Sequence, residues 1–241
     1  EAAETVLAGM SESHVQVACE RIARKFSVNV DTHLPRVPYR ETISSTAKGV
    51  EHKHKKQTGG SGRYGHVFLD IEPVPDKTFE FTETIVGGVV PKQYIPAVEK
   101  GVREAIEEGP LAGYPMQNVK VTLTYGSYHD VDSSEIAFKI AAAQAFKKGA
   151  LQARPVILEP VMKMEIDVPE GYMGDIMSDL NTKRGHVLGM TPQEGGLTRI
   201  EAMAPLAEVQ RYATDLRAIT QGRGTYRMTF DHYQAVPPHI T

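Results

Sequence analysis

Residues 158–241 carry strand and helix patterns in an order that few folds accommodate. Strand patterns at 159–168 and 225–233 flank a hairpin pattern at 185–205, and two helical stripes of apolar residues lie between them. The stripes are formed by Tyr172, Met173, Ile176, Met177 and Leu180, and by Val209, Tyr212, Ala213, Leu216 and Ile219. The order β-α-β-β-α-β fits two helices packed on one face of a four-stranded antiparallel sheet. We therefore predict a ferredoxin-like domain at 158–241.

The first two thirds of the chain read as two further pieces of an α+β protein. Residues 1–43 are predicted to form strand, helix and strand, with the strands at 5–10 and 27–34 and the helix from Ser11 to Phe26. Such a β-α-β piece buries little surface alone, so we predict that it is part of a ferredoxin-like fold.

Residues 44–157 are predicted to form a second unit with mixed strands and helices. Strand patterns lie at 66–72, 79–88 and 118–125, and helical patterns lie at 95–108 and 133–151. Asp132 precedes Glu135 by three residues, which is the spacing of a capping box and predicts the start of the second helix.

Charge and cysteine content limit the class of protein. The net charge of −3 excludes a generally basic nucleic-acid coat, so any RNA contact must come from a local patch. Cys19 is the only cysteine, which excludes an internal disulfide and favours a reducing, cytoplasmic location. No apolar run is long enough to span a membrane. The first residue is not Met, and we expect the sequence to be a piece of a longer protein.

The stretch "TGGSGRYGHV" at 58–67 contains G-x-G-x-x-G, formed by Gly60, Gly62 and Gly65. A dinucleotide site requires a strand before this motif and a helix after it. The preceding "KGVEHKHKKQ" is polar and makes a poor buried strand, while the following residues have a strand pattern. The sequence therefore argues against a dinucleotide-binding enzyme, although that alternative stays open.

Two loops are predicted to project from one end of the second unit. The start of one strand and the end of its antiparallel neighbour lie at the same sheet edge, which places residues before 66 beside residues after 125. Residues 48–66 hold five Lys and Arg against one Glu, a local charge of +4 without histidines. Bare glycine backbone can approach phosphate, and Ser, Tyr, His and Asp can contact riboses or bases. We predict an RNA-binding tip made of two loops. The first, here called the glycine loop, consists of Lys55, Lys56, Gln57, Thr58, Gly59, Gly60, Ser61, Gly62 and Arg63. The second, here called the histidine loop, consists of Ser127, Tyr128, His129, Asp130, Val131 and Asp132.

The sequence gives less support to other roles for the residues of these two loops. Both loops could be ordinary solvated turns. His52 and His54 lack a partner at zinc spacing, and Asp130 with Asp132 lacks the glycine and distal Glu of a calcium loop. His129 has no Ser or Cys nucleophile at a suitable spacing, so we predict no catalytic residue and no metal.

Several longer stretches resemble the C-terminal half of translation elongation factor G. They are "HKKQTGGSGRYGHV", "IVGGVVPKQYIPAVEKGVREAIEEGPLAGYP", "GSYHDVDSSEIAFKIAA", "EPVMKMEIDVPEGYMGDIMSDLNTKRG" and "YATDLRAITQGRGTY". The resemblance covers residues 36–237 in order. It implies that residues 1–43 are the second half of domain III, that 44–157 are domain IV, similar to ribosomal protein S5, and that 158–241 are domain V.

The resemblance also implies a function and partners. In that family domain IV enters the decoding site of the small ribosomal subunit during translocation of tRNA and mRNA, and its tip matches Gln57 to Arg63 and Ser127 to Asp132. Domain V lies near the sarcin–ricin RNA and the stalk base of the large subunit. The implied partners are 16S and 23S rRNA, a stalk-base protein and tRNA–mRNA. We expect a monomer with no membrane or DNA partner.

Four residues depart from the family pattern. Ser11 and Ser13 stand in the domain III stretch "GMSESHV", where Gly and Leu are usual, and Gln210 and Arg211 replace Phe-Gly before "YAT". The alternative that the protein is a paralogue acting in ribosome recycling or ribosome protection therefore stays open.

GTP hydrolysis is not predicted for this chain. No G-x-x-x-x-G-K-[ST] motif occurs, and "TGGSGRYGH" lacks the Lys-Ser/Thr pair. The resemblance implies that GTP and Mg²⁺ bind in N-terminal domains upstream of these residues, and that the chain itself holds no cofactor.

Overall fold

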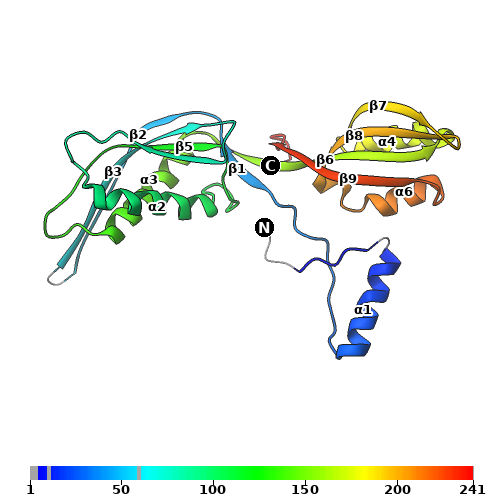
Figure 1. The fold of residues 1–241 in the computed structure, drawn as a ribbon, viewed down its shortest axis with the longest axis horizontal. Helices are drawn as coiled ribbons and strands as arrows, with labels where there is room; N and C mark the ends of the chain where they lie inside the picture. Colours follow the sequence, from blue (N-terminus) through cyan, green and yellow to red (C-terminus); the bar gives the residue numbers. More distant parts are fainter. Residues whose placement is uncertain (1–4, 10–11, 59–60, 241) are drawn as a thin grey trace. The chain divides into compact units, whose positions relative to one another are not determined.

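The computed structural model describes residues 5–9, 12–58 and 61–240, with the side chains of 57, 58, 61 and 62 left aside. The chain divides into two compact units, one formed by 39–158 with 235–241 and the other by 1–38 with 159–234 (Figure 1). The predicted mixed α+β class is confirmed, because both units combine a sheet with helices. No helix within the described ranges is long and apolar enough to cross a bilayer.

The unit around 39–158 is built on a four-stranded sheet in the order β2-β3-β5-β4. Its strands are β2 (Ala47–Thr58), β3 (Ser61–Pro73), β4 (Phe79–Glu83) and β5 (Val119–Ser127). All neighbours are antiparallel except β4 and β5, which are parallel.

Two helices cover one face of this sheet. They are α2 (Ile95–Glu107), which follows the short helix η1 (Lys92–Tyr94), and α3 (Glu135–Gln152); Figure 1 shows both on the same side. The core between the layers is formed by fully buried side chains, Val67, Leu69, Ile71, Val119, Val121, Leu123, Phe138 and Phe146. The opposite face of β2, β3 and β5, here called the open face, carries half-buried and exposed side chains such as Phe68 and Tyr125.

A buried carboxylate holds a loop in the same unit. Glu41 lies on β1 (Arg40–Ile43), which pairs with residues 155–158, and its side chain is fully buried. Its oxygens accept backbone N–H bonds from Leu111 (3.0 Å), Ala112 (2.7 Å) and Tyr114 (3.1 Å). Glu41 therefore satisfies the donors of the loop that follows α2.

The predicted ferredoxin-like fold is confirmed for the last part of the chain. The strands β6 (Pro155–Pro169), β7 (His186–Gln193), β8 (Leu197–Pro205) and β9 (Thr225–Ala235) lie in the order β9-β6-β8-β7. The helices are α4 (Met173–Thr182), which follows η2 (Glu170–Tyr172), and α5 (Leu206–Val209) with α6 (Tyr212–Thr220). Ile176, Leu180 and Tyr212 from the predicted stripes are fully buried against the sheet.

This unit also contains a buried ion pair. The Glu159 side chain is 1% exposed and accepts two bonds from the Arg184 guanidinium, at 2.6 and 2.8 Å. Arg184 Nε donates to Glu208 at 2.9 Å. The hydrogen bonds to Glu159 raise the pKa of Arg184 above its ordinary value, so the arginine stays charged.

Three sequence predictions about local structure are wrong. The helix α1 (Glu12–Phe26) forms, but the described residues of the strands predicted at 5–10 and 27–34 pair with no other strand there. The polar stretch 47–58 is a strand, β2, because its backbone pairs with β3 and needs no apolar side chains. Asp132 does not cap α3: Ser134 is the N-cap, and its Oγ accepts from Ala137 N–H at 3.3 Å.

Candidate nucleic-acid interface

The described residues of the predicted glycine loop lie in the two strands of a long β-hairpin, residues 55–58 in β2 and 61–63 in β3. β2 and β3 pair from Val50 with Leu69 to Thr58 with Ser61, so both strands extend beyond the sheet core. Lys55, Lys56 and Arg63 are exposed near the turn, and Lys53 is exposed closer to its base. Gly59 and Gly60 lie outside the described residues, and Gln57, Thr58, Ser61 and Gly62 are placed by backbone pairing alone. The hairpin therefore carries the predicted basic patch.

The histidine loop connects β5 to α3 and is organised by its own histidine. His129 Nδ1 accepts N–H bonds from Val131 (3.3 Å) and Asp132 (3.2 Å), and Ser133 Oγ accepts from His129 N–H at 2.8 Å. With Nδ1 as an acceptor, the neutral ring carries its proton on Nε2. Tyr128, His129, Asp130 and Val131 are exposed, Val131 at 83%. The loop thus presents polar and apolar side chains on a turn of fixed shape.

The two loops meet at Tyr64, so the predicted geometry is confirmed for the described residues. Tyr64 N–H donates to Asp132 O at 2.8 Å, and Tyr64 also forms a bridge with Ser133. The Tyr64 and His129 rings lie 6.3 Å apart between centroids. The same end of the unit therefore carries the basic hairpin and the histidine loop.

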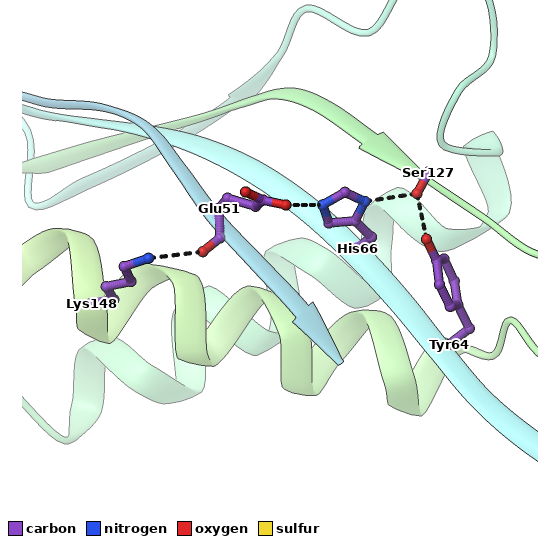
Figure 2. Close-up of polar contacts among 5 residues, drawn as sticks. All are labelled: Glu51, Tyr64, His66, Ser127 and Lys148. Atoms are coloured by element: carbon purple, nitrogen blue, oxygen red, sulfur yellow. Dashed lines mark hydrogen bonds and ion pairs between the residues drawn. The ribbon is translucent and has the colours of Figure 1, made fainter. Parts of the chain in front are cut away.

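A chain of hydrogen bonds, which the sequence did not predict, crosses the open face beside these loops (Figure 2). Glu51 Oε1 lies 2.8 Å from His66 Nε2, His66 Nδ1 lies 2.7 Å from Ser127 Oγ, and Ser127 Oγ lies 2.7 Å from the Tyr64 hydroxyl. Lys148 of α3 donates to the backbone oxygen of Glu51 at 3.4 Å. The chain joins β2, β3 and the first residue of the histidine loop.

A β-bulge aims Ser127 at this chain. Leu69 pairs with Leu123 but Phe68 pairs with Tyr125, so Thr124 is an extra residue in β5. Thr124 Oγ1 donates to Phe68 O at 3.2 Å. The extra residue reverses the alternation and turns Tyr125 and Ser127 onto the open face, opposite Phe68 and His66. Simple alternation from the buried Leu123 would have turned both inward.

Glycine at 65 serves packing. A Cβ at this position would lie 2.5 Å from the backbone of Ala137, in the first turn of α3. Gly65 therefore lets the helix that follows the histidine loop lie directly against β3. No helix follows the motif, since β3 continues to Pro73, so the context that a dinucleotide site requires is absent from the described residues here.

Gly65→Ala is expected to lower the free energy of unfolding by about 1–3 kcal/mol, because backbone must move to admit the methyl group. Urea denaturation measures the change. Gly174→Ala is the control, since a Cβ there meets nothing within 4 Å. Equal stability of the two variants would contradict the packing role.

The hydrogen bonds link a serine, a histidine and an acid, Ser127, His66 and Glu51, as in the catalytic triad of a serine hydrolase. The sequence predicts no such triad around His129. In such enzymes the hydroxyl must be free to attack a substrate. Here Ser127 Oγ lies within hydrogen-bond distance of both His66 and Tyr64. We therefore interpret the arrangement as a structural chain.

The histidines of β2 do not form a metal site with other described residues. No group of three or more His, Cys, Asp or Glu side chains suited to a metal occurs in the described part of the chain. Burial lowers the pKa of His52, and the nearby His54, Lys148 and His66 lower it further.

Comparison with known proteins matches the whole chain to one family. Family models match at residues 1–34 (Elongation Factor G, domain III), 35–154 (Elongation factor G, domain IV) and 156–241 (Elongation factor G C-terminus). The crystal structure of ttk003000868 from Thermus thermophilus is 46% identical, with a TM-score of 0.86 over 96% of this chain. The match covers 34% of that protein, so this chain spans about a third of its length.

Proposed function

Because the chain belongs to the elongation factor G family, we propose that it is the ribosome-binding part of a translational GTPase that promotes translocation of tRNA and mRNA. The observation that carries this proposal is the meeting of the histidine loop and the basic hairpin at Tyr64. Exposed Lys and Arg side chains can contact phosphates, and the exposed Tyr, His and Asp can contact riboses and bases.

In this proposal the tip enters the decoding site and separates the codon–anticodon duplex from the contacts that hold it. The ferredoxin-like unit would bind near the sarcin–ricin RNA and the stalk base. GTP and Mg²⁺ would bind in domains that precede residue 1, because the family models matched here are domain III, domain IV and the C-terminus. The protein would act as a monomer in the cytoplasm.

Replacing His129 and Asp130 with Ala in the full-length protein is expected to slow single-round translocation by about tenfold, equivalent to about 1.4 kcal/mol. The change removes the Nδ1 acceptor that shapes the histidine loop and two exposed polar groups. GTP hydrolysis on the ribosome should stay unchanged, because the substitutions lie far in sequence from any nucleotide site.

Asp76→Ala is the control, since Asp76 is an exposed acid just beyond Pro73, at the other end of β3 from the hairpin turn. Normal translocation in the His129 and Asp130 variant would rule out the tip assignment. A loss of GTP hydrolysis would show that the loop acts on the GTPase step instead.

A second function within the same family is ribosome recycling or ribosome protection. The residues that depart from the family pattern favour this second function. Ser13 is exposed in the first turn of α1, and Gln210 and Arg211 lie between α5 and α6. Ser11 lies outside the described residues. Subunit splitting with a recycling factor, measured beside translocation, separates the two functions.

A further inference from the structure

We propose that Tyr64 is a further RNA-contacting residue of the tip, with Glu51, His66 and Ser127 as the positioning residues that orient its hydroxyl. This inference rests on the proposed function. It changes the role of Ser127, which the sequence assigned to direct RNA contact, and it adds Tyr64, which lies one residue beyond the predicted glycine loop.

Tyr64 occupies the junction of the two loops. Its N–H is bound to Asp132 O, its hydroxyl is bound to Ser127, and its half-buried ring lies near His129. Lys53 Nζ lies 5.2 Å from the ring centroid, within the range of a cation–π contact. A phenol with an exposed ammonium beside it matches the ribose and phosphate of one nucleotide.

The hydrogen-bonded chain from Glu51 to Tyr64 determines whether the Tyr64 hydroxyl can donate or accept a further hydrogen bond. The Glu51 carboxylate accepts only, so the neutral His66 ring donates from Nε2 and accepts at Nδ1. Ser127 then donates to His66 and accepts from the Tyr64 hydroxyl. The proton of Tyr64 is used within the protein, and its oxygen is left as an acceptor.

An acceptor at this place selects the ligand. A phosphate oxygen has no proton to give, whereas a ribose 2′-hydroxyl can donate to Tyr64. Lys53, with three N–H donors, would hold the neighbouring phosphate. Because Lys53 would hold the phosphate of the same nucleotide, we take the donor to be its ribose 2′-hydroxyl, and such a contact distinguishes RNA from DNA at this position.

The test is a double-mutant cycle in the full-length protein, with single-round translocation as the readout. Tyr64→Phe keeps the ring and removes the hydroxyl, and Ser127→Ala removes the middle of the chain. Each is expected to slow translocation about three- to fivefold, the usual effect of one lost hydrogen bond. The double variant should be no slower than the slower single variant, because both changes remove the same contact.

Tyr125→Phe is the matched control, because Tyr125 is also a tyrosine of the open face but takes no part in the hydrogen-bonded chain; this variant should translocate normally. A second readout in this 241-residue chain is the imidazole nitrogen shifts of His66. In the assigned direction Nε2 carries the proton and Nδ1 accepts, so the two nitrogens should have the shifts of a protonated and an unprotonated imidazole nitrogen, respectively. The shift of a protonated nitrogen at Nδ1 would overturn the assigned direction of the hydrogen-bonded chain.

The outcomes separate this inference from the proposed function. Slow translocation in the His129 and Asp130 variant with normal translocation in Tyr64→Phe overturns the inference alone. Additive slowing in the double variant overturns the positioning role of Ser127. Normal translocation in all of these variants overturns both proposals.

Discussion

Arg184→Met is expected to lower the free energy of unfolding by about 3–5 kcal/mol, the usual cost of leaving one member of a buried ion pair alone. Glu159 is 1% exposed, and Arg184 donates two hydrogen bonds to it. Without the guanidinium the carboxylate must remain buried and unpaired, take up a proton, or draw water into the unit. Urea denaturation followed by circular dichroism measures the loss.

The same unit provides a matched control on its surface. Arg199 also donates two bonds to a carboxylate, Asp167, at 2.8 Å each, but the arginine side chain is 38% exposed. Exposed pairs are screened by water and contribute little to stability, so Arg199→Met should be nearly neutral. Similar losses for the two variants would show that burial of Glu159 is not the cause.

A double variant tests the mechanism further. Replacing Glu159 and Arg184 together with Met removes the buried charge as well as its partner, and apolar replacements of this kind are often neutral. We expect the double variant to regain most of the stability lost in Arg184→Met. A double variant less stable than the single one would contradict the argument from unpaired charge.

Glu41→Leu is expected to cost about 3–5 kcal/mol, because several backbone N–H groups lose their acceptor and each buried unpaired donor costs about 1–3 kcal/mol. The three donors are Leu111, Ala112 and Tyr114. Gly109 leaves the space for this carboxylate, since a Cβ there would lie 2.3 Å from Glu41 Cδ. Leucine cannot replace the bonds, so the loop 109–114 should also lose protection from amide hydrogen exchange.

Two further variants test whether the loss of stability is specific to the buried Glu41 carboxylate. Glu108→Leu changes an 80% exposed side chain nearby in the same unit and should leave stability within about 0.5 kcal/mol. Glu41→Gln retains one acceptor oxygen and should fall between the wild type and Glu41→Leu. Unchanged exchange at 109–114 in Glu41→Leu would show that the loop is held by other contacts.

The sequence predicted the parts of the fold where apolar periodicity decides the structure. The ferredoxin-like order at 158–241 follows from two helical stripes, and Ile176, Leu180 and Tyr212 are indeed buried. The strand β2 was missed because its alternation is between polar residues. Val50 faces the core and His52 is half-buried, while Glu51 and Lys53 are exposed on the other face.

The predicted strands at 5–10 and 27–34 show the opposite error. Residues 27–34 alternate as in a sheet, but a strand also needs a neighbour, and α1 itself has no buried residue. Asp132 was assigned as a cap from its spacing to Glu135, yet Ser134 lies in extended backbone immediately before α3 and takes that position. Spacing within one segment does not identify which of several polar residues adopts the cap conformation.

The candidate site was predictable only in part. Antiparallel pairing of β3 with β5 placed the two loops together; Lys55, Lys56, Arg63 and residues 128–131 are exposed there, whereas Ser127 and Asp132 are half-buried. The hydrogen-bonded chain was not predictable, because Glu51, His66 and Ser127 are 15 and 61 residues apart and meet only through strand register. The register itself depends on the β-bulge at Thr124, which no pattern in the sequence predicted.

That bulge makes one residue of β5 dispensable for the pairing. Losing the single codon for Thr124 would place Tyr125 directly after Leu123, and regular alternation would then keep Tyr125 and Ser127 on the open face, opposite Phe68 and His66. Losing a paired residue such as Thr122 would instead shift its neighbours to the wrong face of the sheet. Selection on this gene should therefore tolerate a one-residue deletion at Thr124 better than one at Thr122.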